Sequence, residues 1–129
     1  MNEHEEGFVR SFIEKSKQER TAMLLSTPKR RIKFLKSLAY FRDLDVRHAK
    51  VVPPTVAHTV DEWLRLLRSK GAPERCWVIS EDLSRDGKED DLEHALKETI
   101  GGGMGTALSC IPGRLGYFED EEEQRLLER

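Results

Sequence analysis

One acidic stretch in the second half of the chain has the side chains and the spacing of a metal-binding site. Asp82, Ser84 and Asp86 alternate along the sequence, Gly87 follows them, and Glu93 comes six residues after this glycine. This is the oxygen spacing of a calcium-binding loop, in which alternate side chains point at one centre and a distal glutamate closes the site. Asp82, Ser84, Asp86 and Glu93 are therefore our candidate ligands for Ca²⁺ or Mg²⁺.

The same acidic stretch is also explained without a metal. The residues before it have the pattern of a strand, whereas a calcium loop of this kind follows a helix, and Glu89 occupies a position that is normally aliphatic. Acidic side chains in the first turn of a helix interact favourably with the helix dipole. A polar turn that leads into a helix is the competing interpretation, and an acidic face for a basic partner is a third.

The opposite charge is concentrated in residues 29–36, whose sequence is KRRIKFLK. Such a basic amphipathic segment can neutralise the phosphates of a nucleic acid or serve as the surface for another partner. It is equally the pattern of a core helix with a charged outer face. The candidate partner-binding residues in this segment are Arg30, Arg31, Lys33 and Lys36.

A fifth candidate partner-binding residue, Arg114, follows a tight turn. Pro112 and Gly113 suit the two central positions of a type II turn, because proline has a fixed φ and glycine accepts a positive one. We predict a hairpin with Arg114 at its tip, where a guanidinium can bind a carboxylate or a phosphate. Ordinary hairpin chemistry explains the same residues without a ligand.

No pattern typical of catalysis or of cofactor binding occurs. The glycine-rich residues 101–105 lack the GK[ST] ending of a phosphate loop and follow a predicted helix, so we expect a helix cap and connector there. Cys76 and Cys110 lie in apolar runs and are expected to be small buried residues. Neither GxSxG nor HExxH is present, and no catalytic residue is predicted.

Apolar periodicity and capping residues predict the elements that carry these side chains. Thr27 followed by Pro28 is typical of a helix start, and Thr59 with Glu62 forms a capping box. The predicted helices cover residues 5–25 (in one or two pieces), 28–41, 59–71 and 88–100. The predicted strands cover residues 76–79, 106–110 and 115–118, with a further extended segment at 42–52.

This order of elements predicts a single α+β domain over residues 1–129. We expect a mainly antiparallel sheet of three or four strands with helices packed against it. The acidic tail at 119–129 is expected to be frayed or to form a short docked helix.

The charge is divided unevenly along the chain of 129 residues, although the net charge is only -2. Residues 1–50 carry 12 basic and 7 acidic side chains, and the remaining residues carry 10 and 17. The two halves can attract each other within one fold or between two copies, or the basic half can bind an anionic partner. We find neither a secretory signal nor the run of about 20 apolar residues that spans a membrane, and so expect a cytoplasmic protein without a membrane partner.

Three stretches carry a resemblance to a known family: WVISED at 77–82 with the following Asp86–Gly87, GMGT at 103–106, and SCIPGRLGY at 109–117. Over about residues 76–119 the chain is similar to a family of short, uncharacterised bacterial proteins. The resemblance implies a bacterial source and assigns no activity, cofactor or site residue.

Because no catalytic pattern is found and both charged patches can serve as surfaces, we predict a non-enzymatic protein-interaction or regulatory module. Its partner is expected to be another protein or a second copy of the chain. Two alternatives stay open: a small enzyme of unrecognised type that uses the acidic divalent-ion site, and nucleic-acid binding through the predicted helix 28–41.

Overall fold

The computed structural model describes residues 1–129 and contains one six-stranded sheet. All neighbouring strands are antiparallel, and their order across the sheet is β1-β6-β5-β4-β2-β3. The strands are β1 (Ala49–Val51), β2 (Arg75–Ser80), β3 (Lys88–Asp91), β4 (Thr106–Ile111), β5 (Leu115–Glu119) and β6 (Gln124–Glu128). The α+β class is confirmed, whereas the expected three or four strands are corrected to six.

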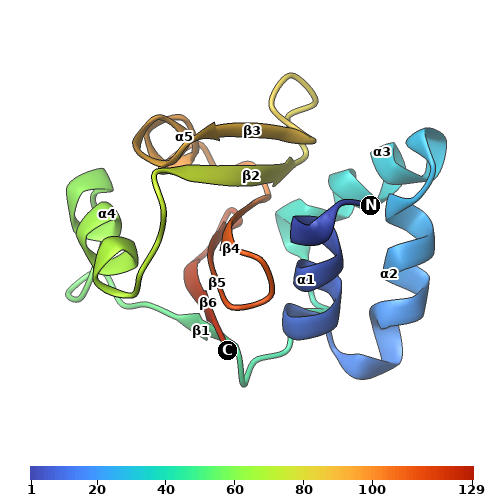
Figure 1. The fold of residues 1–129 in the computed structure, drawn as a ribbon, viewed down its shortest axis with the longest axis horizontal. Helices are drawn as coiled ribbons and strands as arrows, with labels where there is room; N and C mark the ends of the chain where they lie inside the picture. Colours follow the sequence, from blue (N-terminus) through green and yellow to red (C-terminus); the bar gives the residue numbers. More distant parts are fainter.

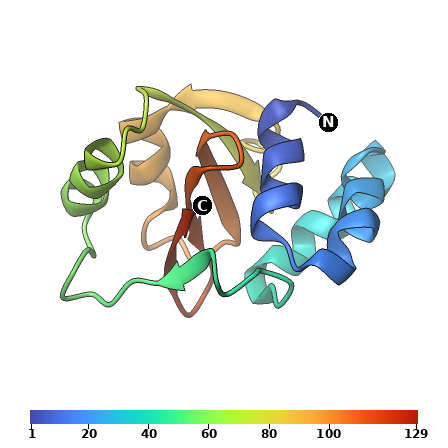
Figure 2. The same cartoon turned by 60° about the horizontal axis from the view of Figure 1, so that its bottom comes forward.

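Helices cover both faces of this sheet (Figure 1). The helices are α1 (Glu3–Phe12), α2 (Gln18–Leu25), α3 (Pro28–Lys36), α4 (Val60–Ser69) and α5 (Leu92–Thr99), with the short 3₁₀ segments η1 (Lys15–Lys17) and η2 (Ser37–Tyr40). Helices α1 to α3 lie on one side of the sheet, and α4 and α5 lie on the other, as the turned view in Figure 2 also shows. None of the helices is both long and apolar enough to cross a membrane.

Strand β2 shows how one sheet supports two apolar cores. Trp77 and Ile79 contact the core beneath α1 to α3, whereas Cys76 and Val78 belong to the core beneath α4 and α5. This alternation is the two-residue period of a strand. Because both faces are covered, the strand has no solvent side, which explains its unbroken apolar run in the sequence.

Two local predictions are confirmed in detail. Thr59 Oγ1 accepts a hydrogen bond from the backbone N–H of Glu62 at 3.2 Å, and Glu62 Oε1 accepts one from the Thr59 N–H at 3.1 Å, so α4 begins with a capping box. At the β4–β5 turn, Arg114 N donates to Ile111 O at 3.0 Å and Gly113 has a φ of 68°. Both features form between residues close in sequence.

The predicted helix at 88–100 is wrong in its first turn. Residues 88–91 form β3, the edge strand that pairs with β2, and the helix begins at Leu92. Asp91 is its N-cap, since its side chain accepts a hydrogen bond from His94 N at 3.0 Å. The charged sequence of β3 gives no alternating apolar signal because this edge strand buries little of its surface.

The predicted fraying or helix at 119–129 is also wrong, because this tail ends in strand β6. β6 lies between β5 and β1 and pairs with both. Leu127, only 1% exposed, belongs to the core beneath α1 to α3. Long-range pairing therefore orders a segment whose charge alone suggested disorder.

The helix predicted at 28–41 is α-helical to Lys36 and continues as the 3₁₀ segment η2. The backbone of η2 packs on the residue that precedes β4: a Cβ on Gly105 would lie 2.2 Å from the carbonyl carbon of Leu38. This close approach requires glycine. It places Tyr40, at the end of η2, beside the β5–β6 turn.

Candidate interaction surface

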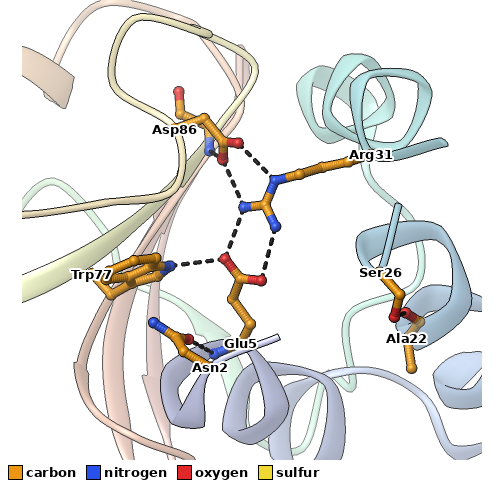
Figure 3. Close-up of polar contacts among 8 residues, drawn as sticks. Asn2, Glu5, Ala22, Ser26, Arg31, Trp77 and Asp86 are labelled. Carbon is orange, nitrogen blue, oxygen red and sulfur yellow. Dashed lines mark hydrogen bonds and ion pairs between the residues drawn. The ribbon is translucent and has the colours of Figure 1, made fainter. Parts of the chain in front are cut away.

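Helix α3 turns one arginine inward. The guanidinium of Arg31 donates to both carboxylate oxygens of Glu5 in α1, each at 2.8 Å, and its Nε donates to Asp86 Oδ2 at 2.7 Å (Figure 3). All three side chains are largely buried. The triad joins α1, α3 and the loop between β2 and β3, and so fixes which side of α3 faces the protein.

Further hydrogen bonds hold the two carboxylates in place. Trp77 Nε1 in β2 donates to Glu5 Oε2 at 2.9 Å (Figure 3). The backbone N–H of Ser80 donates to Asp86 Oδ1 at 3.0 Å. Burial acts to raise the pKa of Glu5, but hydrogen bonds from Arg31 and Trp77 outweigh burial, and the pKa is lowered. For the Arg31 guanidinium, burial likewise opposes hydrogen bonds from Glu5 and Asp86, which raise its pKa.

Arg31 is therefore not available to a partner, which corrects its place among the predicted partner-binding residues. The other three predicted residues of α3, Arg30, Lys33 and Lys36, are exposed, as is Lys29. Their side chains form no ion pair or hydrogen bond within the chain, in contrast to Arg31. Apart from Arg31, residues 15–42 contain eight basic side chains and one acidic one, so this part of the surface is strongly positive.

Residues of α2, α3 and η2 and the segment after η2 line a groove of about 330 Å³. Helices α2 and α3 lie at the end of the molecule away from α4 and α5 (Figures 1 and 2). The apolar part of the groove is formed by Leu24, Phe34 and Phe41, with the two phenylalanine rings packed edge to face at 5.6 Å between centroids. The remaining lining residues are Arg20, Thr21, Lys33, Ser37, Tyr40, Arg42 and Asp43. We refer to it as the α2–α3 groove.

The cationic side chains Arg20, Lys33 and Arg42 line the α2–α3 groove without any ion pair to an acidic group of the chain. Each comes from a different element: α2, α3 and the segment after η2. Helix α3 therefore supplies only one of the three cationic side chains of the groove. Sequence reasoning missed Arg20 and Arg42 because neither lies in the basic run at 29–36.

Tyr40 separates this groove from a second hollow of similar volume, about 330 Å³. Both are lined by Tyr40, Phe41 and Arg42, and Tyr40 is 62% exposed. The Tyr40 hydroxyl donates to Glu121 Oε2 at 2.5 Å, a hydrogen bond that raises the pKa of the tyrosine. The other residues of the second hollow are Ala39, Leu44, Val46, Asp120, Glu122, Glu123 and Arg125.

The acidic residues of this second hollow belong to the β5–β6 turn, residues 120–123. Asp120 Oδ1 accepts hydrogen bonds from the backbone N–H groups of Glu122 and Glu123, each at 2.8 Å, which closes the turn. Glu121 and Glu122 are exposed at its tip, and Glu123 pairs with Arg125. A basic groove and an acidic turn thus lie on either side of Tyr40.

The neighbouring Glu119 has a structural role. It is 4% exposed and accepts hydrogen bonds from the Tyr117 hydroxyl at 2.7 Å and from the N–H groups of Gly101 and Gly103, each at 3.3 Å. The glycine-rich segment therefore wraps around a buried carboxylate of the same chain. This agrees with the connector predicted for residues 101–105.

The four candidate metal ligands point to different protein partners. Asp82 Oδ1 accepts hydrogen bonds from Ser84 N at 3.1 Å and Ser84 Oγ at 2.7 Å. Asp86 binds Arg31, and Glu93 pairs with Lys97 at 3.0 Å. No group of three or more His, Cys, Asp and Glu side chains is arranged to hold a metal ion. The predicted Ca²⁺ or Mg²⁺ site stays a prediction that this arrangement does not favour.

The remaining predicted residues lie elsewhere. Arg114 is exposed on the β4–β5 turn, which packs against α1 and not against α3. Cys76 and Cys110 are buried and free, as expected, and burial raises the pKa of both thiols, that of Cys110 to about 12. Neither thiol has the lowered pKa of a nucleophilic cysteine.

Comparison of the chain with protein-family models, with curated proteins and with solved structures gives no match. The resemblance of residues 76–119 to a family of short bacterial proteins therefore stays a prediction.

Proposed function

We propose that this chain is a non-enzymatic protein-interaction module that binds an acidic amphipathic segment of a protein partner in the α2–α3 groove. The observation that carries the proposal is the combination of an apolar floor with cationic side chains that have no ion-pair partner. Phe34, Phe41 and Leu24 form the floor, and the cations are Arg20, Lys33 and Arg42.

The chemistry of the groove defines what fits it. A partner must supply an apolar side chain that covers the floor and carboxylates that reach the rim. Burial of an apolar anchor provides most of the affinity in such interfaces, whereas charge complementarity provides orientation and association rate. Arginine suits this rim because its planar guanidinium can bind a carboxylate through two hydrogen bonds.

A protein partner fits the surface better than a nucleic acid. The acidic turn at residues 120–123 lies just beyond Tyr40, where it would repel a phosphate backbone that extended from the groove. A protein segment can carry acidic, basic and apolar side chains together. It can therefore complement both the basic groove on one side of Tyr40 and the acidic turn on the other. Nucleic-acid binding is the alternative that the experiment must separate from this proposal.

The test uses a short fluorescein-labelled peptide of alternating Glu and Leu with one central Phe, measured by fluorescence anisotropy. The double variant Arg20→Glu/Lys33→Glu reverses two rim charges and should lower peptide affinity by about tenfold or more, equivalent to about 1.4 kcal/mol. The matched control Lys29→Glu/Lys36→Glu changes the same charge on α3 outside the groove. It should leave the affinity within about twofold, because neither side chain lines the groove and an attraction across solvent is screened by salt.

Equal losses in both double variants would show general electrostatic attraction and would overturn the groove as the site. A labelled single-stranded oligonucleotide tests the alternative. If the oligonucleotide binds more tightly than the peptide and its affinity falls steeply with salt, the basic surface is a nucleic-acid interface and the proposal fails.

A further inference from the structure

We propose that the acidic segment that occupies the α2–α3 groove is the β5–β6 turn of a second copy of this chain, in a two-fold symmetric dimer. The inference rests on the proposed function and names its partner. One molecule carries both a basic groove and an acidic turn, and charged side chains in each have no ion-pair partner within the chain. Arg20, Lys33 and Arg42 have no acidic partner in their own chain, and the exposed Glu122 has no basic one.

The positions of the two patches suit a two-fold axis. The groove lies on one side of Tyr40 and the acidic turn on the other, since Tyr40 lines the groove and binds Glu121. A two-fold axis that passes near Tyr40 would place the turn of each copy on the groove of the other. One interface would then contain two identical sets of ion pairs, as in an isologous dimer.

The surface of the second hollow, beside the groove, has the composition of an interface centre. Tyr40 is 62% and Val46 69% exposed, and both line the second hollow together with the buried Leu44. A protein interface usually has apolar and aromatic side chains at its centre and charged groups around them. In the dimer these two exposed side chains would be covered, and Tyr40 would face its own counterpart.

The acidic turn is suited to insertion because its shape is set before binding. Two backbone N–H groups bind Asp120 Oδ1, which closes the turn and leaves Glu121 and Glu122 at its tip. A preorganised turn loses less conformational entropy when it binds than a flexible segment does. The β5–β6 turn can therefore enter the groove without a change of its backbone shape.

A charge-swap experiment tests this arrangement. Sedimentation velocity of the wild-type chain should give a species of twice the 14.9 kDa chain mass. The groove variant Arg20→Glu/Lys33→Glu and the turn variant Glu121→Lys/Glu122→Lys should each be monomeric, because like charges then meet at both contacts. An equimolar mixture of the two variants should dimerise again, because each groove then meets a turn of opposite charge.

Controls make the outcomes distinct. The variant Lys29→Glu/Lys36→Glu should stay dimeric, and circular dichroism should show that every variant is folded. A Tyr40→Cys variant should be joined to its counterpart by a short bismaleimide, whereas Leu83→Cys, at a similarly exposed position on the β2–β3 loop, should not. Cys76 and Cys110 give no background because both are buried.

Each contrary result has one meaning. A monomeric wild-type chain that still binds the acidic peptide would overturn the dimer and leave the proposed function intact. A wild-type dimer that survives the groove variant, or a mixture that does not dimerise, would place the contact elsewhere and overturn the inference. A monomer without peptide binding would overturn both.

Discussion

Gly7 in helix α1 lies against Gly113 in the β4–β5 turn, so closely that a Cβ on Gly7 would be 2.4 Å from the backbone nitrogen of Gly113. No side chain fits between these two backbones. The contact brings the first helix onto the sheet and places Glu5, two residues earlier, within reach of Trp77 and Arg31. A backbone contact without side chains thus positions the buried triad.

The substitution Gly7→Ala should therefore destabilise the protein, although alanine favours a helix by about 1 kcal/mol over glycine. The added methyl group meets backbone atoms that cannot rotate away, and overpacking of this kind costs about 1–3 kcal/mol or more. We expect a net loss in the free energy of unfolding measured by urea titration. Glu6→Ala, on the exposed side of the same helix, is the control and should change little. Unchanged or increased stability in Gly7→Ala would contradict the close approach.

Replacement of Arg31 by methionine should be strongly destabilising, because Glu5 and Asp86 then share a buried site without a cation. Breaking a buried ion pair from one side costs about 3–5 kcal/mol, which chemical denaturation would detect. The control is Arg47→Met, since Arg47 also pairs with an aspartate but is itself 74% exposed. Its loss should be much smaller, because an exposed ion pair is screened by solvent. Similar losses in the two variants would contradict a specific role for the triad.

Stability should also fall at acid pH through Glu5. Its pKa in the folded protein is lowered from the ordinary value of 4.5, so the folded state binds the proton less readily than the unfolded chain. The resulting stabilisation is present above about pH 4.5 and is lost as the pH falls through the lower, folded-state pKa. Urea midpoints measured from pH 6 to pH 2 should therefore decrease less in Glu5→Gln than in the wild-type chain. Parallel curves for the two proteins would show that Glu5 is not the group involved.

The elements predicted correctly from sequence depend on residues that are close together along the chain. The Thr59–Glu62 capping box and the turn at Pro112–Gly113 both form as expected, because backbone geometry and short side chains are sufficient to specify them. The same holds for the apolar run of β2. Strands β3 and β6 were missed because their pairing partners, not their own composition, make them strands.

The amino-acid sequence alone was sufficient to predict the α+β class, the starts of α3 and α4, the β4–β5 hairpin and a strongly basic segment at 29–36. The role of each charged side chain depends on contacts that form only in the folded protein. Arg31 and Lys33 lie in the same basic run, yet Arg31 is buried because it meets Glu5 and Asp86, which are 26 and 55 residues away. Lys33 instead lines a groove with Arg20 and Arg42. The charge of a side chain can be read from the sequence. Whether that side chain is buried, and which other side chains lie beside it, is set by contacts between segments that are distant along the chain.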